Sequence, residues 1–440
     1  KRMKETVYPS AVGGRISAPA SKSYAQRALA AALLVPAAEN PIGWSELRNM
    51  GLCNDTSAAL EVVRGLGAKV RYGDGHRVYY VEGGFLRTVP DELSVGESGL
   101  SARLFTPIAA QSPVPVRIVG EGSLLRRPVA AAMAEPLVAL GARFEYAEGG
   151  FLPVTVSGPL QGGSVEVDGS LSSQFITGLL MALPLSAQDT RLAVRNPKSV
   201  PYLAMTLEVL RAFGISVKAA ADYTEFVVPG RQQYRPTNYA IEGDWSGASC
   251  LLVAGAVASE GDGVAVANLN PRSLQADRAI VDALKRAGAR VTFGSGHLLT
   301  VGCAEERLRG FEFDATDCPD LFPALAALAA FCEGVTVLRG TTRLTHKESD
   351  RAATIAAEFS KLGVSIDLSQ EDRMVIRGLS TPDDGLTVRD ASLDSHNDHR
   401  IAMATAVASL RADRPVTISN AQAVDKSYPQ FWNDLKQLYY

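Results

Sequence analysis

The sequence predicts an α/β protein of two domains, each built from three copies of a repeated unit. Three observations predict this: the length, a glycine that recurs at an even spacing, and polar loops that open at the same spacing onto apolar helices. At 440 residues the chain is too long for one ordinary hydrophobic core, so two domains are expected. A hydrophobic content of 46% with 21% charged residues is typical of a globular protein.

The first periodic feature is a glycine that follows an amphipathic stretch and precedes a strand-like run, as in LGAKV and AGARV. Helices commonly end at such a glycine, because it adopts the left-handed conformation without strain. The amphipathic stretches predict outer helices that lie on the surface. The glycines recur after 74, 73, 74 and 75 residues, at Gly67, Gly141, Gly214, Gly288 and Gly363.

The second periodic feature is a polar loop that opens onto a helix with apolar residues on nearly every side, as in SKSYAQRALAAALL. These inner helices are expected to be buried. Each unit therefore holds one inner helix, one outer helix and several strands. The loops recur after 77, 74, 73, 74 and 78 residues, at Lys22, Gly99, Ser173, Ser246, Asp320 and Asp398.

The sequence contains six inner helices, but the periodic glycine follows only five outer helices. This difference predicts a sixth unit that is split between the two ends of the chain. WNDLKQLYY supplies its outer helix, and TVYPS supplies a strand. The polar segment 230–240 falls after three units and suits a crossover between domains, as does the region near residue 20. The domains are expected at 21–234 and at 1–20 with 235–440. An ordinary doubly wound α/β protein is the alternative, because its alternation of strands and helices looks similar.

Composition excludes several classes of protein. The net charge of -3 argues against a nucleic-acid partner. No segment reaches about 18 apolar residues, so no membrane span is expected, and no signal peptide is expected because the N-terminus lacks an apolar core. The five scattered cysteines predict free thiols and a cytoplasmic protein.

His396 and His399 lie near Asp394 and Asp398, but their spacing matches no standard zinc motif, so no metal is expected.

The openings of the inner helices concentrate the chemistry. Helix N-termini bind anions, and here they carry hydroxyls and cations, which suits a pair of substrates that carry phosphates. Simpler interpretations exist: Ser21 and Ser172 as helix caps, Thr345 with Glu348 as a capping box, and Asp320 as a favourable charge at a helix start. The cations at or near these openings are Lys22, Arg27, Arg103, Arg126, Arg127, Lys347, Arg351, Arg400 and Lys426.

The motifs SKSYAQR, RRP, DGSLSSQF, DCPD, HKESDR, HNDHR and DKSYPQFW occur in the order typical of the EPSP synthase (3-phosphoshikimate 1-carboxyvinyltransferase) family, which the chain resembles over essentially its whole length. The resemblance implies a two-domain inside-out α/β barrel of six βαβαββ repeats, with no metal or organic cofactor. It implies transfer of the enolpyruvyl group of phosphoenolpyruvate to the 5-hydroxyl of shikimate 3-phosphate, with release of phosphate. A monomer that closes its domains around these small molecules is expected.

The resemblance also implies site residues. Contacts with shikimate 3-phosphate are implied for Lys22, Ser23, Arg27, Ser172, Ser173, Gln174, Ser199, Tyr202, Asp320 and Lys347. Contacts with phosphoenolpyruvate are implied for Lys22, Gly99, Arg127, Gln174, Arg351, Arg400 and Lys426. The reaction needs a base near the hydroxyl and an acid near C3 of phosphoenolpyruvate. Asp320 is the candidate base, and Glu348, assisted by Lys22, is the candidate acid.

Three positions depart from the family pattern. Glu97 stands where an asparagine is usual, Leu100 where a threonine is usual, and Arg343 where some members have an asparagine. A glutamate beside a phosphate would repel it unless the side chain turns away or pairs with an arginine. The sister enzyme that acts on UDP-N-acetylglucosamine is an alternative, although it lacks SKS and KESDR and generally has a reactive cysteine where this N-terminal half has only Cys53. A non-catalytic homologue is the alternative of another class.

Overall fold

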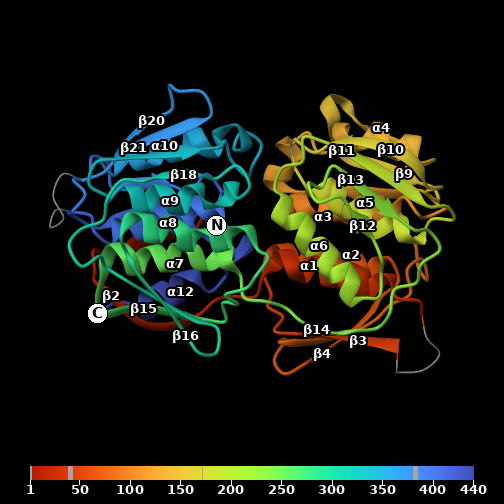
Figure 1. Ribbon diagram of the computed structural model, residues 1–440, viewed down its shortest axis with the longest axis horizontal. Helices are drawn as coiled ribbons and strands as arrows, with labels where there is room; N and C mark the ends of the chain where they lie inside the picture. Colours follow the sequence, from red (N-terminus) through yellow and green to blue (C-terminus); the bar gives the residue numbers. More distant parts are fainter. Residues whose placement is uncertain (1, 38–42, 171, 380–384) are drawn as a thin grey trace. The chain divides into compact units, whose positions relative to one another are not determined.

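The computed structural model describes residues 2–37, 43–170, 172–379 and 385–440. The chain divides into two compact units, and each is described by itself. Residues Ala20–Ile241 form one of them, called the inserted unit here. Residues Lys1–Pro19 and Glu242–Tyr440 form the other, called the terminal unit. Helices and strands interleave along both units (Figure 1), which confirms the α/β class.

The described part of the inserted unit contains three four-stranded sheets. The first has the order β14 (Asn238–Ala240), β3 (Trp44–Arg48), β5 (Val78–Glu82) and β4 (Lys69–Gly73). The second has the order β6 (Glu92–Ser94), β7 (Val116–Val119), β9 (Phe151–Ser157) and β8 (Arg143–Ala147). The third has the order β10 (Gly163–Asp168), β11 (Thr190–Arg195), β13 (Glu225–Val228) and β12 (Lys218–Ala219).

The described part of the terminal unit contains two further four-stranded sheets. One has the order β16 (Arg290–Gly294), β17 (Leu298–Gly302), β15 (Ser259–Ala267) and β2 (Val12–Ser17). The other has the order β18 (Glu312–Asp314), β19 (Val335–Arg339), β21 (Arg373–Arg377) and β20 (Ser365–Asp367). All five four-stranded sheets share one pattern, a parallel pair followed by two antiparallel neighbours, so the repeated unit is confirmed.

The sixth sheet joins the two ends of the chain. Strand β1 (Lys4–Val7) runs antiparallel to β23 (Val416–Ser419), with Lys4 opposite Ser419 and Val7 opposite Val416. Strand β22 (Ser392–Asp394) pairs with β23 in parallel, which completes a three-stranded sheet. The prediction of a sixth repeat divided between the termini is therefore confirmed.

Inner and outer helices differ in burial as predicted. The inner helices are buried on nearly every side: α1 (Lys22–Leu34), α3 (Gly99–Ala109), α5 (Gln174–Ala182), α7 (Trp245–Ala258), α9 (Phe322–Ala329) and α11 (His399–Ser409). The outer helices bury only part of their surface: α2 (Asn54–Gly65), α4 (Ala131–Ala139), α6 (Val200–Ala212), α8 (Ile280–Ala287), α10 (Arg351–Lys361) and α12 (Phe431–Gln437).

The five periodic glycines terminate outer helices as expected. Each has a positive φ, between 81° at Gly214 and 117° at Gly67. At Gly67 a Cβ atom would also lie 2.3 Å from the carbonyl oxygen of Gly84, so only glycine fits. One local expectation was incomplete: residues 238–240 of the polar segment form strand β14, which pairs with β3 in parallel and completes its sheet. No helix among the described residues has the length and apolar character needed to cross a membrane.

Candidate functional site

The few inner-helix residues that are not buried are mostly polar and lie near the helix starts. In α1 they are Lys22 and Ser23, in α3 Arg103, in α5 Gln174, and in α7 Ser246. The rest of each inner helix packs in the hydrophobic interior, so these starts are rigidly held. Rigid helix N-termini with accessible donors provide the anion-binding geometry that the sequence predicted.

Lys22 begins α1, whose N-cap Ser21 accepts a hydrogen bond from the Tyr24 N–H at 3.3 Å. The Lys22 ammonium lies 2.6 Å from Oδ2 of Asp55, which lies in the first turn of α2 with its side chain 4% exposed. Ser21 is therefore a helix cap, and Lys22 is held by a buried carboxylate. Asp55 was missed in the sequence, since nothing in an amphipathic helix start indicates a partner 33 residues away.

Arg27 lies one turn further along α1 and is almost completely buried. Its Nη1 donates to Ser23 Oγ at 2.6 Å, and its Nε donates to Thr206 Oγ1 at 3.0 Å. Its Nη2 donates to the Tyr202 carbonyl at 3.4 Å. Burial lowers the pKa of Arg27 to about 10, so the guanidinium keeps its charge at neutral pH. The structure thus brings together three predicted residues: Ser23, Arg27 and Tyr202.

Arg127 lies directly against the start of α3. A Cβ atom on Gly99 would be 2.7 Å from Nη1 of Arg127, so the glycine allows the guanidinium to approach the helix backbone. Ser98 caps this helix by accepting from the Ser101 N–H at 3.0 Å. Gly99 and Arg127 together offer helix N–H groups and a nearby cation to one anionic group.

The start of α5 is tied to α3 through Arg103, whose Nη1 donates to Gln174 Oε1 at 2.9 Å. Ser172 Oγ accepts from the Gln174 N–H at 3.1 Å, so it organises the turn before the helix. Ser173 is buried and occupies the N-cap position without a side-chain capping bond. Arg103 was recognised as a cation in the sequence but was not assigned to a substrate.

Ser199 has a left-handed backbone with φ 51° and directly precedes α6. Such a conformation is costly for serine, and residues held this way cluster at functional sites. Tyr202 lies in the first turn of α6 and packs against the core of the inserted unit. The backbone strain agrees with the ligand contact that is expected of Ser199.

The terminal unit carries a dense cluster of charges around Arg351, which is completely buried. Its Nη1 lies 2.6 Å from Asp320 Oδ1, its Nη2 2.7 Å from Glu348 Oε2, and its Nε 2.8 Å from Asp398 Oδ2. Three carboxylates thus converge on one guanidinium. Asp398 also caps α11 and accepts from Ser349 Oγ at 2.9 Å. The sequence placed Asp398 at a helix opening but did not predict that it holds Arg351.

Further cations lie around Asp320. Lys347 Nζ is 3.5 Å from its Oδ1, and Arg400 Nη2 is 3.8 Å from its Oδ2. Burial alone would raise the pKa of Asp320, but Lys347, Arg400 and Arg351 outweigh it and hold that pKa well below its ordinary value. The carboxylate is therefore ionised at neutral pH. Arg400 is itself buried in the first turn of α11.

Glu348 contacts Arg351 and also lies 3.8 Å from the Lys426 ammonium. The capping-box interpretation of Thr345 and Glu348 was wrong. Helix α10 begins at Arg351, and its N-cap is Asp350, which accepts from the Ala353 N–H. Glu348 therefore precedes the helix, and its side chain is engaged by two cations.

The structure shows the surroundings of the three residues that depart from the family pattern. Glu97 turns to Ser123, whose N–H and Oγ it accepts at 3.1 and 2.9 Å. Leu100 is buried in the core of the inserted unit. Arg343 donates from Nη1 to the Thr316 carbonyl at 2.5 Å.

His396 has a structural role. His396 Nε2 lies 2.8 Å from Oε1 of the buried Glu358. The other oxygen of Glu358 accepts from the Asp394 N–H at 3.0 Å, which braces the loop before α11. Over the ranges that the structure describes, no group of three or more His, Cys, Asp or Glu residues could hold a metal ion.

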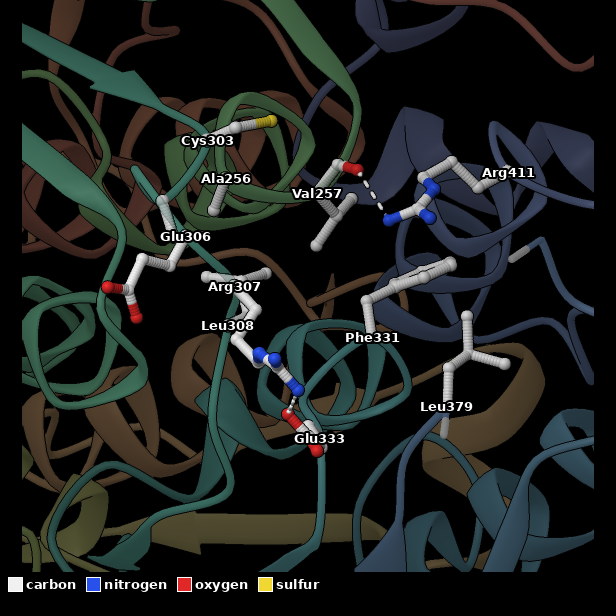
Figure 2. Close-up of a pocket in the computed structure, with 11 residues that line it drawn as sticks. Ala256, Val257, Cys303, Glu306, Arg307, Leu308, Phe331, Glu333, Leu379 and Arg411 are labelled. Atoms are coloured by element: carbon white, nitrogen blue, oxygen red, sulfur yellow. Dashed lines mark hydrogen bonds and ion pairs between the residues drawn. The ribbon is translucent and has the colours of Figure 1, made fainter. Parts of the chain in front are cut away.

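A cavity of about 180 Å³ lies elsewhere in the terminal unit (Figure 2). It is lined by residues at the C-terminal ends of inner helices, including Val257 of α7, Phe331 after α9, and Arg411 after α11. The Arg411 guanidinium stacks 4.9 Å from the ring centroid of Phe331 and donates to the Val257 carbonyl at 3.3 Å. Asp320 and Arg400, which were predicted to bind substrates, lie at the opposite ends of α9 and α11, and neither lines this cavity.

Comparisons with known proteins agree with the motifs. The family profile of EPSP synthase (3-phosphoshikimate 1-carboxyvinyltransferase) matches residues 7–435. The 3-phosphoshikimate 1-carboxyvinyltransferase of Halobacterium salinarum is 39% identical over 445 residues, covering 99% of both chains. That of Clostridium novyi is 34% identical over 441 residues, covering 98% of this chain and 96% of the relative. The structure of EPSP synthase from Acinetobacter baumannii superimposes with a TM-score of 0.81 at 26% identity, covering 100% of this chain and 98% of that one. The chain belongs to the EPSP synthase family.

Proposed function

We propose that the protein transfers the enolpyruvyl group of phosphoenolpyruvate to the 5-hydroxyl of shikimate 3-phosphate and releases phosphate. Family membership makes it a transferase of the shikimate pathway. The observation that carries the assignment of roles is the cluster in which Asp320 and Glu348 share the buried Arg351. An acid and a base held together by one fixed cation suit a reaction that adds and later removes a proton.

We assign the cations and the neighbouring polar groups to two anionic substrates. In the proposal, Arg127 with Gly99, and Arg400 with Lys426, bind phosphoenolpyruvate, together with Lys22 and Gln174. Shikimate 3-phosphate is assigned to the remaining polar groups: Ser23, Arg27, Ser172, Ser173, Ser199, Tyr202, Lys347 and Asp320. Arg351 is a special case, because its guanidinium is buried among carboxylates. We assign it first to fixing Asp320 and Glu348, and its contact with phosphoenolpyruvate stays a prediction.

Asp320 is the proposed base for the 5-hydroxyl. A carboxylate with a strongly lowered pKa is a weak base, so the surrounding cations work against this role. Binding of the anionic substrates is expected to make Asp320 more basic. When their carboxylate and phosphate groups pair with Arg400 and Lys347, those cations stabilise the ionised Asp320 less. The pKa of Asp320 then rises toward the value that proton transfer requires.

Glu348 is the proposed acid. It delivers a proton to C3 of phosphoenolpyruvate while the hydroxyl oxygen bonds to C2, which gives a tetrahedral intermediate. It then takes a proton back from C3 as the bond from C2 to the phosphate oxygen breaks, which leaves the enolpyruvyl ether. The departing phosphate takes up the proton that Asp320 accepted from the hydroxyl, so both carboxyl groups return to their starting states. Lys22, fixed by Asp55, assists this transfer. The fixed cations stabilise charge as it develops, because their positions need no rearrangement.

The sister reaction on UDP-N-acetylglucosamine receives no support from Cys53. Its side chain is buried, and its Sγ lies 3.2 Å from Thr56 Oγ1. Burial, with a contribution from Asp55, raises the pKa of the Cys53 thiol, which disfavours the reactive thiolate.

We also propose that the protein acts in the cytoplasm as a monomer whose domains close on the substrates. The free thiols of all five cysteines support a reducing compartment.

A phosphate-release assay tests the proposal. Phosphate should appear only when phosphoenolpyruvate and shikimate 3-phosphate are both present. Release with UDP-N-acetylglucosamine in place of shikimate 3-phosphate would favour the sister activity, and no release with either acceptor would favour a non-catalytic homologue.

A further inference from the structure

Glu97 lies in the short loop between β6 and α3, and it contacts a second loop of the same unit. Its Oε2 accepts two hydrogen bonds from Ser123, one from the N–H at 3.1 Å and one from Oγ at 2.9 Å. Ser123 is 3% exposed. Hydrogen bonds to an ionised acceptor are about twice as strong as neutral ones, so this is a firm link between the loops.

The second loop accommodates Glu97 through a glycine. Gly122 has φ 53°, and a Cβ atom there would lie 2.3 Å from the carboxyl carbon of Glu97. Backbone hydrogen bonds reinforce the link, since the Glu121 N–H donates to the Gly96 carbonyl at 2.8 Å. Loop conformation and carboxylate therefore fit each other closely.

The same loop ends at Arg127. Residues Gly122–Arg126 form a short 3₁₀ turn, and Arg127 is its C-cap, with its N–H donating to the Leu124 carbonyl at 3.1 Å. The guanidinium of Arg127 then lies against Gly99, two residues after Glu97. The carboxylate thus anchors one end of the turn while the arginine projects from the other end.

We infer that Glu97 is a positioning residue: it anchors the turn at Ser123 and thereby fixes the Arg127 guanidinium over Gly99, where phosphoenolpyruvate is proposed to bind. The inference rests on the proposed function. It differs from a purely electrostatic role, in which a carboxylate near the site would repel the anionic substrate. The two roles predict opposite effects when the carboxylate is removed.

The test compares Glu97→Ala, Glu97→Gln and Ser123→Ala in the full chain, with steady-state kinetics for both substrates. Glu97→Ala should raise the KM for phosphoenolpyruvate roughly 5–50-fold, the effect of losing one or two charged hydrogen bonds, with the KM for shikimate 3-phosphate changed less than about twofold. Glu97→Gln keeps an acceptor oxygen and should restore most of the loss. Glu92→Gln, which changes an exposed partner of Arg117, is the matched control and should match the wild type.

Coupling to Arg127 supplies the second readout. If Glu97 acts through the arginine, Glu97→Ala should add little to Arg127→Ala in the double variant. Independent, additive losses would overturn the inference, as would an unchanged or lowered KM for phosphoenolpyruvate in Glu97→Ala. Equal losses for both substrates would mean a general structural role and would overturn it too. A wild-type protein without transferase activity would instead contradict the proposed function.

Discussion

Arg351 holds Asp320 through an ion pair of 2.6 Å between Nη1 and Oδ1 while its own side chain is only 1% exposed. With Glu348 and Asp398, this pair makes Arg351 the centre of a buried network. Arg400 approaches Asp320 less closely, at 3.8 Å. The two arginines should therefore differ in what they do, although both were predicted to bind phosphoenolpyruvate.

Arg351→Ala should lower the free energy of unfolding by about 3–5 kcal/mol, because it leaves the buried Asp398 and the partly buried Glu348 and Asp320 without their cation. Arg400→Ala should lose less stability and should weaken phosphoenolpyruvate binding roughly 10–150-fold, with shikimate 3-phosphate affected far less. Urea unfolding and isothermal titration measure the two effects. Arg339→Ala, which removes an exposed ion pair with Glu312, is the control. Similar losses of stability in both site variants would contradict this division of roles.

Glu348→Gln should lower turnover by ~100–10,000-fold, since glutamine cannot exchange a proton with C3. Binding of shikimate 3-phosphate should change little, because the side chain keeps its size and an acceptor for Arg351. Single-turnover kinetics and titration of the ligand check both points. Glu333→Gln, on the exposed Arg307 pair, should behave as the wild type. Turnover near the wild-type rate would leave Glu348 with only a structural role.

The buried carboxyl of Asp277 is expected to make the stability of the protein depend on pH. Burial, with a smaller contribution from Asp320, raises the pKa of this carboxyl to about 7. Between the unfolded pKa near 4 and this value, the folded state binds a proton that the unfolded state lacks, so stability falls as pH rises. This stability is present at about pH 4 and is lost as the pH rises, and the loss is complete above about pH 7.

Asp277→Asn should remove that loss. Its free energy of unfolding, measured with urea from about pH 4.5 to 8, should fall less steeply with pH than that of the wild type. Asp282→Asn changes an exposed carboxylate in the next helix and should keep the wild-type slope. Identical slopes for all three proteins would show that Asp277 titrates normally.

The repeat was predictable because it depends on local chemistry. A glycine with a left-handed backbone ends the outer helices α2, α4, α6, α8 and α10, and apolar residues on nearly all sides mark each inner helix. Pairings between distant residues could not be read in this way. Asp55 with Lys22 and Asp398 with Arg351 meet only after the helices have packed, and the sequence carries no signal for either pair. Strand β14 was missed for the same reason, since its pairing with β3 outweighs its polar composition.

We expect Leu100 to reduce the sensitivity of the protein to glyphosate, an inhibitor that the family resemblance implies would occupy the phosphoenolpyruvate site. It is the second residue of α3, directly after Gly99, and it is 8% exposed. A leucine is bulkier than the usual threonine and lacks its hydroxyl, so the start of the helix should shift and crowd the longer inhibitor. Leu100→Thr should lower the glyphosate inhibition constant roughly 5–150-fold, with a smaller effect on phosphoenolpyruvate.

The control for this change is Leu125→Thr, at a leucine that is 47% exposed in the neighbouring turn. It should leave inhibition as in the wild type. If Leu100→Thr also leaves the inhibition constant unchanged, Leu100 does not determine sensitivity.

The transfer of an enolpyruvyl group to shikimate 3-phosphate can be followed directly. Phosphoenolpyruvate labelled with ¹³C at C2, incubated with the protein and shikimate 3-phosphate, allows the fate of that carbon to be followed by NMR. The label is expected to move into an enol ether at the 5-oxygen of shikimate 3-phosphate, with one inorganic phosphate released for each ether formed. Label that stays in phosphoenolpyruvate, or that enters an enol ether only when UDP-N-acetylglucosamine is the acceptor, would contradict the proposed function.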